Sequence, residues 1–103
     1  MKITDKFTEV QLQSMFSFLE ELDKCNSNLL SNCKVKGLKS YIDKKNNYVC
    51  AYVYESFGAS DGKTIDIKYK KIDSNGEITD LMDLYKNEQN LNDSISKMEE
   101  INI

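Results

Sequence analysis

The chain has 103 residues and contains no histidine, arginine, tryptophan or proline. Without histidine it lacks an imidazole that could accept a proton near neutral pH or bind a metal, and without arginine it lacks a bidentate partner for phosphates and guanine edges. Its length suits one domain with a single hydrophobic core. These absences argue against most kinds of catalysis. We therefore expect a binding protein, not an enzyme, with no metal and no cofactor.

The net charge of −3 is distributed unevenly along the chain. Residues 34–74 hold nine lysines against five acidic residues, whereas residues 75–103 hold two lysines against seven acidic residues. The first 33 residues are mildly acidic, with three lysines against five acidic residues. A basic centre between two acidic ends favours a polarised surface that offers a partner charge of one sign.

Three cysteines, Cys25, Cys33 and Cys50, show no close C-x-x-C spacing. This pattern predicts reduced thiols that serve as small buried hydrophobic side chains. The N-terminus does not start like a signal peptide, and no apolar run approaches the length of a membrane span. We therefore expect a cytoplasmic protein, in the host cytoplasm if a phage encodes it, that makes no contact with a membrane.

The first predicted element is an amphipathic helix over residues 8–30. Thr8 and Gln11 fit a capping box, and Phe7 with Leu12 fits the hydrophobic staple that often accompanies one. Apolar side chains then recur at helical spacing and predict the face that packs on the core; they are Leu12, Met15, Phe16, Leu19 and Leu22.

Three strands follow, over residues 35–42, 48–57 and 64–72. Gly37 interrupts the first and indicates a bulge or a close backbone contact, and short polar connections predict an antiparallel meander. Both faces of the second strand are partly apolar, which is typical of a central strand. In the third, strict alternation predicts that Ile65, Ile67 and Tyr69 point inward.

The C-terminal third is harder to assign. Residues 74–77 contain an Asn-Gly turn that can return a brief fourth strand around Ile78, after which Thr79 can cap a helix. Residues 87–90 should break that helix, a second helical segment follows, and residues 101–103 should fray. The predicted fold is α+β: one small domain over residues 1–103 with an N-terminal helix, a meander of three or four strands and a C-terminal helix, either continuous or split in two.

Two segments come close to known ligand-binding motifs without matching them. Residues 58–64 fall one residue short of a phosphate-binding P-loop, and a strand pattern follows where that motif needs a helix. Residues 73–78 resemble the middle of a calcium-binding EF-hand loop, but Lys71 and Met82 stand where oxygen ligands are required. Both segments are better interpreted as turns.

The first candidate surface is the acidic C-terminal segment. A carboxylate-bearing segment can occupy a basic groove that evolved for a nucleic-acid backbone. The residues expected to bind such a protein partner are Glu77, Asp80, Asp83 and Glu88. The other interpretation is an ordinary solvated helix face.

The second candidate surface is a sheet rich in tyrosine and lysine. Aromatic rings on a basic sheet can stack on bases while lysines neutralise phosphates. The candidate nucleic-acid face consists of Tyr52, Tyr54, Lys68, Lys70 and Lys71. Because only lysine is available, such binding would be weak, sensitive to salt and poor in base specificity.

The leading hypothesis is a protein-binding module, acting as a stoichiometric inhibitor or adaptor on a nucleic-acid-handling enzyme. In style, though not in sequence, the chain is similar to small phage or mobile-element proteins such as anti-defence proteins (anti-CRISPR proteins among them) and toxin-immunity proteins. The alternative is weak nucleic-acid binding through the tyrosine- and lysine-rich sheet. A monomer and a homodimer formed through a strand edge are both compatible with the sequence.

Overall fold

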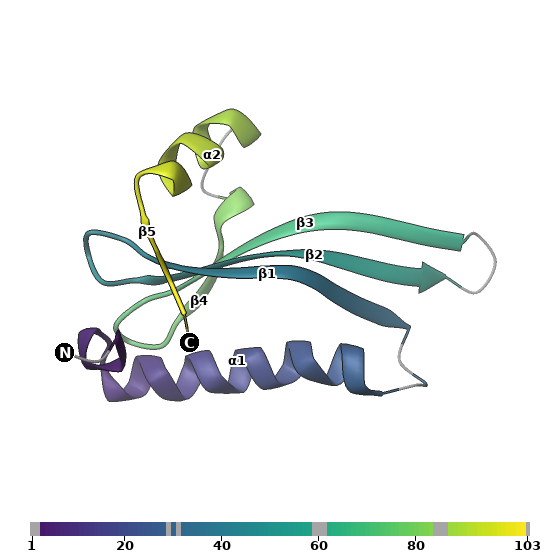
Figure 1. The fold of residues 1–103 in the computed structure, drawn as a ribbon, viewed down its shortest axis with the longest axis horizontal. Helices are drawn as coiled ribbons and strands as arrows, with labels where there is room; N and C mark the ends of the chain where they lie inside the picture. The colour runs from purple at the N-terminus through teal and green to yellow at the C-terminus, as the bar shows by residue number, and fades with distance from the viewer. Residues whose placement is uncertain (1–2, 29, 31, 59–61, 84–86, 103) are drawn as a thin grey trace.

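A computed structural model of the chain has an antiparallel sheet between two helices of unequal length (Figure 1). The structure describes residues 3–28, 30, 32–58, 62–83 and 87–102. The elements are η1 (Ile3–Lys6), α1 (Glu9–Ser27), β1 (Cys33–Ile42), β2 (Tyr48–Gly58), β3 (Gly62–Ile72), β4 (Ile78–Asp80), η2 (Leu81–Asp83), α2 (Glu88–Ser96) and β5 (Glu99–Ile101). The strand order is β4-β3-β2-β1-β5. The predicted α+β class is confirmed.

Helix α1 begins with the predicted capping box. The Gln11 N–H donates to Thr8 Oγ1 (3.0 Å), and the Thr8 N–H donates to Gln11 Oε1 (3.1 Å). The helix ends at Ser27, a few residues before the predicted end. Its last turn is tied to the sheet, because the side-chain amide of Asn26 both donates to and accepts from the backbone of Val35, each at 2.8 Å. Asn26 thus fixes where the helix gives way to β1.

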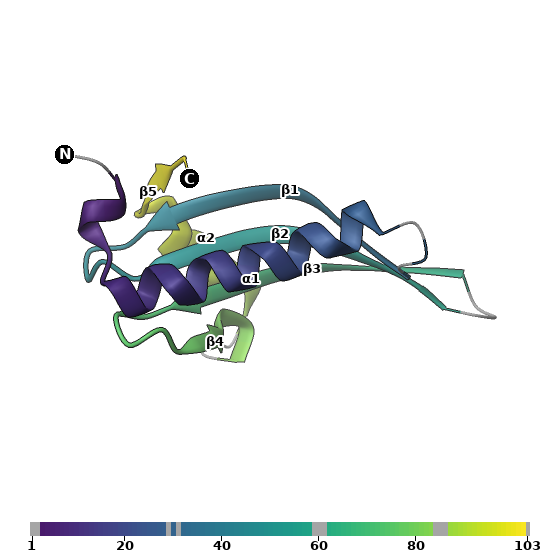
Figure 2. The ribbon, with the colours of Figure 1, turned by 90° about the horizontal axis from the view of Figure 1, so that it is seen from below.

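One face of the sheet packs along the length of α1. Figure 2, which views the molecule from the helix side, shows α1 running along the strands. Met15 and Leu22 are buried against the sheet, and Phe18 packs on Tyr52 with ring centroids 6.1 Å apart. The predicted stripe is wrong at Phe16, whose side chain is half exposed. The buried side chains on this face include Val35, Ile42, Tyr48, Cys50 and Ile72.

The meander of β1, β2 and β3 matches the prediction, including its irregularity. The β1–β2 register shifts between Lys36 and Lys39, and Gly37 adopts a φ of 61°, a left-handed conformation that glycine takes without strain. Along β3 the predicted alternation is present and Tyr69 is buried. The prediction that Ile65 and Ile67 point into the core is wrong, because both are about half exposed.

The C-terminal third differs most from the prediction. Ile78 starts the brief strand β4, but Thr79 lies within that strand and caps no helix. The turn η2 follows, and Leu84 and Tyr85 of the predicted helix lie outside the described residues. Helix α2 is capped by Asn87, in the segment expected to break a helix. Ile101 does not fray: it pairs with Ser40 in β5 and is buried.

Helix α2 carries the chain from one edge of the sheet to the other. It follows β4 and η2 at one edge and leads into β5 at the opposite edge, on the face that α1 does not cover (Figure 1). Leu91 is fully buried there, against a second core cluster that includes Val49, Tyr69 and Leu81. The sheet therefore has an apolar cluster on each face.

The prediction of three reduced cysteines is wrong for two of them. Cys25, near the end of α1, and Cys33, at the start of β1, form a disulfide across eight positions of sequence. Spacing alone missed it because the link depends on the turn that folds β1 back along the helix. Cys50 is free and fully buried, as expected.

Candidate functional site: the open face and a lysine-lined pocket

The face of the sheet that carries α2 is covered over only part of its length. A nine-residue helix is about 14 Å long, whereas the eleven-residue strands β2 and β3 each extend about 35 Å. In Figure 1, α2 sits over one end of the sheet and the β2–β3 hairpin extends well beyond it. We call the uncovered part of this surface the open face.

The open face has an apolar stripe formed by β2 and β3. Phe57, Ile65 and Ile67 are 39%, 55% and 50% exposed, and Val53, which pairs with Ile67, lies between the exposed side chains and the β1 edge. Large aliphatic and aromatic groups exposed together on a sheet are typical of interaction surfaces. The sequence alone does not separate an exposed apolar stripe from a buried one. Apolar and polar residues alternate in the same way whether or not a helix covers the apolar side of the strand.

Lysines border the stripe. Strand β1 contributes Lys34, Lys36 and Lys39, which lie opposite Glu55, Val53 and Ala51 of β2 in the sheet register. Lys63 stands at the hairpin end of β3, opposite Phe57. Among the strand residues that the structure describes on this face, Glu55 is the carboxylate within the stripe. The border is therefore cationic.

Two lysines balance the negative charge of Glu55. Its side chain is only 8% exposed, and its Oε1 is 3.4 Å from Lys36 Nζ and 3.8 Å from Lys63 Nζ. A buried carboxylate must be paired because removing its charge from water is costly. Since these ion pairs cross the stripe, Glu55 links the lysine border on β1 to the lysine on β3.

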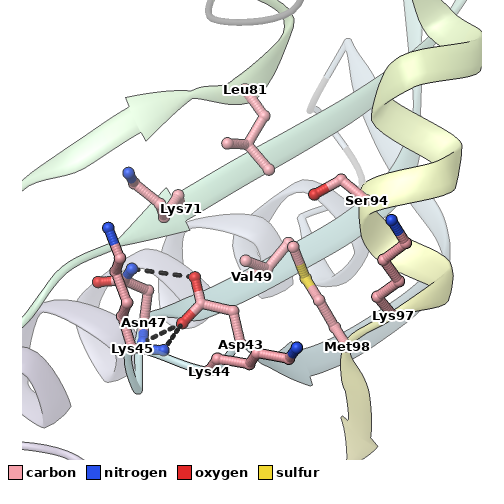
Figure 3. A pocket seen from close by; sticks show the side chains of 10 residues that line it. All are labelled: Asp43, Lys44, Lys45, Asn47, Val49, Lys71, Leu81, Ser94, Lys97 and Met98. Carbon is pink, nitrogen blue, oxygen red and sulfur yellow. Dashed lines mark hydrogen bonds between the residues drawn. The ribbon is translucent and has the colours of Figure 1, made fainter.

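On the same side of the sheet, beside α2, lies a pocket of about 350 Å³ (Figure 3). Val49, Leu81 and Met98 give it an apolar lining. Four lysines line it: in Figure 3, Lys45 and Lys71 lie on the left, Lys97 lies on the right, and Lys44 lies at the bottom, below Asp43. Asp43, Asn47 and Ser94 complete the lining.

The predicted acidic segment is only partly described. Glu77 is exposed in the turn before β4. Asp80 is half buried and accepts a hydrogen bond from Lys70 Nζ at 3.1 Å. Burial alone would raise the pKa of Asp80, but hydrogen bonds from Met82 N–H and Lys70, together with the charges of Lys70 and Lys68, hold it below its ordinary value. The side chains of Asp83 and Glu88 lie outside the described part of the structure.

The predicted nucleic-acid face is divided between the two sides of the sheet. Tyr52 is buried beneath α1, Tyr54 is partly buried against the same cluster, and Lys68 and Lys70 lie beside them on β3. Lys71 points to the opposite side and lines the pocket. The structure thus groups four of the five residues on the α1 face, where the helix limits access to the tyrosine rings.

The buried titratable groups form a cluster on β2. Burial raises the pKa of Cys50 to about 11, an effect that a hydrogen bond with Tyr48 reduces only in part. Burial, with contributions from nearby charges, also raises the pKa of Tyr52 to about 12 and that of Tyr48 well above its ordinary range. The Tyr48 hydroxyl is satisfied by Ser40 Oγ at 2.7 Å. At neutral pH the Cys50 thiol is therefore protonated and unsuited to nucleophilic attack.

Because the pKa of Cys50 rises from 9.0 to about 11 on folding, the protein should lose stability as the pH rises through this window. The loss from Cys50 is roughly 2 kcal/mol at about pH 10.5. Urea unfolding of the wild type and Cys50→Ala at about pH 8 and pH 10.5 measures it. The alanine variant should lose less stability over this interval; equal losses in the two proteins would contradict the assignment.

Within the described residues there is no cluster of three or more metal-ligating cysteine, aspartate or glutamate side chains, and no helix has the length and apolar character to cross a membrane. Comparison with protein-family models, with curated proteins and with solved structures finds no match for this chain. The physical character of its surfaces is therefore the basis for any functional conclusion.

Proposed function

We propose that this chain is a protein-binding module without catalytic activity, a stoichiometric inhibitor or adaptor that docks through the open face. The observation that carries the proposal is the exposed apolar stripe of Phe57, Ile65 and Ile67. Burying such side chains against a partner removes apolar surface from water, which is the main favourable contribution in protein association. The rigid sheet beneath them limits the entropy lost on docking.

The charges around the stripe point to the chemistry of the partner. Lys34, Lys36 and Lys39 line one border and Lys63 one end, so the matching surface would be apolar at its centre and carry carboxylates at its rim. A second copy of this chain suits the open face poorly, because face-to-face pairing would bring two sets of lysines around one stripe. We therefore propose a different protein as the partner.

Nucleic-acid binding is the weaker alternative. Tyr52 is buried under α1, and the rings that could stack on bases would have to leave the core to do so. The exposed groups of the open face are mainly aliphatic, which suits a protein surface better than a base. Salt-titrated gel shifts with single-stranded DNA and RNA separate the two: strong shifts lost in Lys68→Gln would favour the alternative.

The role in a phage or mobile element and the cytoplasmic location also belong to this proposal, and so does a nucleic-acid-handling enzyme as target, which would be bound at an acidic rim and not at its basic groove. The redox state of Cys25 and Cys33 in cells bears on the location, since the cytoplasm of most organisms keeps thiols reduced. Alkylation of the free thiols at cell lysis, followed by mass spectrometry, distinguishes a reduced pair from a disulfide. An oxidised pair would contradict a cytoplasmic location.

The binding test starts from the partner that wild-type protein captures in cells of the source organism. We expect a 1:1 complex with the purified partner, and Ile67→Ser should weaken its affinity by about tenfold or more. Ile78→Ser is the matched control, because Ile78 is 46% exposed on the opposite face, at β4. Lys39→Glu should also weaken the complex, and the loss of affinity should be larger at low salt than at high salt.

Three results would contradict the proposal. The first is an equal loss of affinity in Ile67→Ser and Ile78→Ser, which would remove the open face from the interface. The second is binding strengthened by Lys39→Glu, which would require a cationic partner. The third is turnover of any substrate by the purified protein above the rate in buffer.

A further inference from the structure

We propose that the pocket bounded by Lys44, Lys45, Lys71 and Lys97 binds an organic phosphate monoester. This inference does not depend on the proposed function. The pocket lies beside α2 (Figure 3), whereas the open face begins where α2 no longer covers the sheet (Figure 1). Its volume of about 350 Å³ falls within the range of small-molecule sites, roughly 300–1,000 Å³.

The charge of the pocket is the first argument. Among the described residues that line it, Asp43 is the one carboxylate, and that group is engaged by its own turn: it accepts hydrogen bonds from Lys45 N, Asn47 N and Asn47 Nδ2, each at 2.9 Å. None of the ion pairs among the described residues involves the four lysines of the pocket. Four positive charges thus face one carboxylate that is already committed to the turn.

The number of cations selects the kind of anion. A carboxylate carries one negative charge, whereas a phosphate monoester carries nearly two at neutral pH and presents three strong acceptor oxygens. Lysine binds phosphate as a point charge and does not need the planar fork that arginine supplies. Lysines on both sides of the opening can therefore approach one phosphate group.

The lining selects the rest of the ligand. Val49 is fully buried at the base of the pocket, and Leu81 and Met98 pack beside it as part of the cluster beneath α2. Apolar walls give no benefit to bare inorganic phosphate but gain from covering the carbon part of an ester. A phosphorylated molecule with an apolar or aromatic portion matches both the lysines and the apolar lining of the pocket.

Adenosine monophosphate is a suitable probe because it divides into adenosine and inorganic phosphate. We expect it to bind with a Kd of roughly 100 µM or tighter and to shift the amide NMR signals of Val49, Leu81 and Met98. Adenosine and inorganic phosphate should each bind about tenfold more weakly. The pentapeptide Ala-Gly-phosphotyrosine-Gly-Ala tests whether a phosphorylated protein side chain is the better source of the same group.

Variants decide whether the pocket is the site. Lys71→Gln and Lys97→Gln should each weaken binding of adenosine monophosphate about fivefold. Lys68→Gln is the matched control, since Lys68 lies on the same strand but on the face that carries α1. The proposal is overturned if neither phosphorylated probe binds, if adenosine alone binds as tightly as its monophosphate, or if Lys68→Gln weakens binding as much as Lys71→Gln.

Discussion

Replacing Gln11 by alanine should lower the free energy of unfolding by about 3 kcal/mol. Gln11 is only 1% exposed, and its Nε2 donates to Asn46 O (3.0 Å) and to Ile72 O (2.9 Å), so it joins the β1–β2 turn and the end of β3 to α1. Its Oε1 also closes the capping box with Thr8. Alanine would remove these three hydrogen bonds and leave the buried Ile72 carbonyl without its donor, while opening a cavity.

Two further variants isolate the cause. Gln13→Ala removes the same side chain from the exposed face of α1 and should change stability by less than about 0.5 kcal/mol. Gln11→Met keeps most of the volume but none of the hydrogen bonds, so it should retain most of the loss. Urea unfolding of the three variants and the wild type is the measurement. A Gln11→Met variant as stable as the wild type would show that packing alone matters at this position.

Reduction of the disulfide should cost about 2.5 kcal/mol of stability. Cys25 and Cys33 close a short loop of about eight residues, and a link of this length restricts the unfolded chain by that amount in the loop-entropy treatment. The loss should be measurable as a lower urea midpoint in dithiothreitol. Local opening of the reduced protein should start where the disulfide joins the last turn of α1 to the first residue of β1.

The control is the double variant Cys25→Ser with Cys33→Ser. It should match the reduced wild type in stability and should not respond to dithiothreitol, because the remaining cysteine, Cys50, is buried and free. An oxidised wild type no more stable than the double variant would mean that the link does not constrain the unfolded state. Hydrogen exchange at Val35 gives a local readout, since Asn26 holds both its backbone groups.

Local signals in the sequence were enough for the elements that local chemistry determines. The capping box of Thr8 and Gln11, the bulge at Gly37 and the turn at Gly76 each depend on residues within four positions of one another. Strand β5 could not be predicted in this way, because three residues become a strand only when β1 offers an edge to pair with. The disulfide depends likewise on a turn that brings Cys33 back to Cys25.

The candidate site was less predictable than the fold, because the sequence does not show which parts of the sheet the helices cover. Sequence alternation separates the two sides of β3 but does not say which side a helix will cover, so Ile67 on the open face reads like a core residue. Lys68 and Lys71 both look like outward-facing charges, yet they lie on opposite faces of the sheet. The pocket also needs α2 and the β1–β2 turn side by side, which no local pattern encodes.

The free edges of the sheet have a consequence for solubility. Among the described residues, β5 pairs with Ser40–Ile42 of β1 and β4 pairs with Lys70–Ile72 of β3, so neither short strand covers the full length of its neighbour. The uncovered edges could add a strand from another chain, although on β1 Asn26 already occupies both backbone groups of Val35. Lys34, Lys36 and Lys39 lie on β1, along one of these uncovered edges. The lysines that border the open face thus also disfavour polymerisation, because copies that paired edge to edge in register would bring like charges close together.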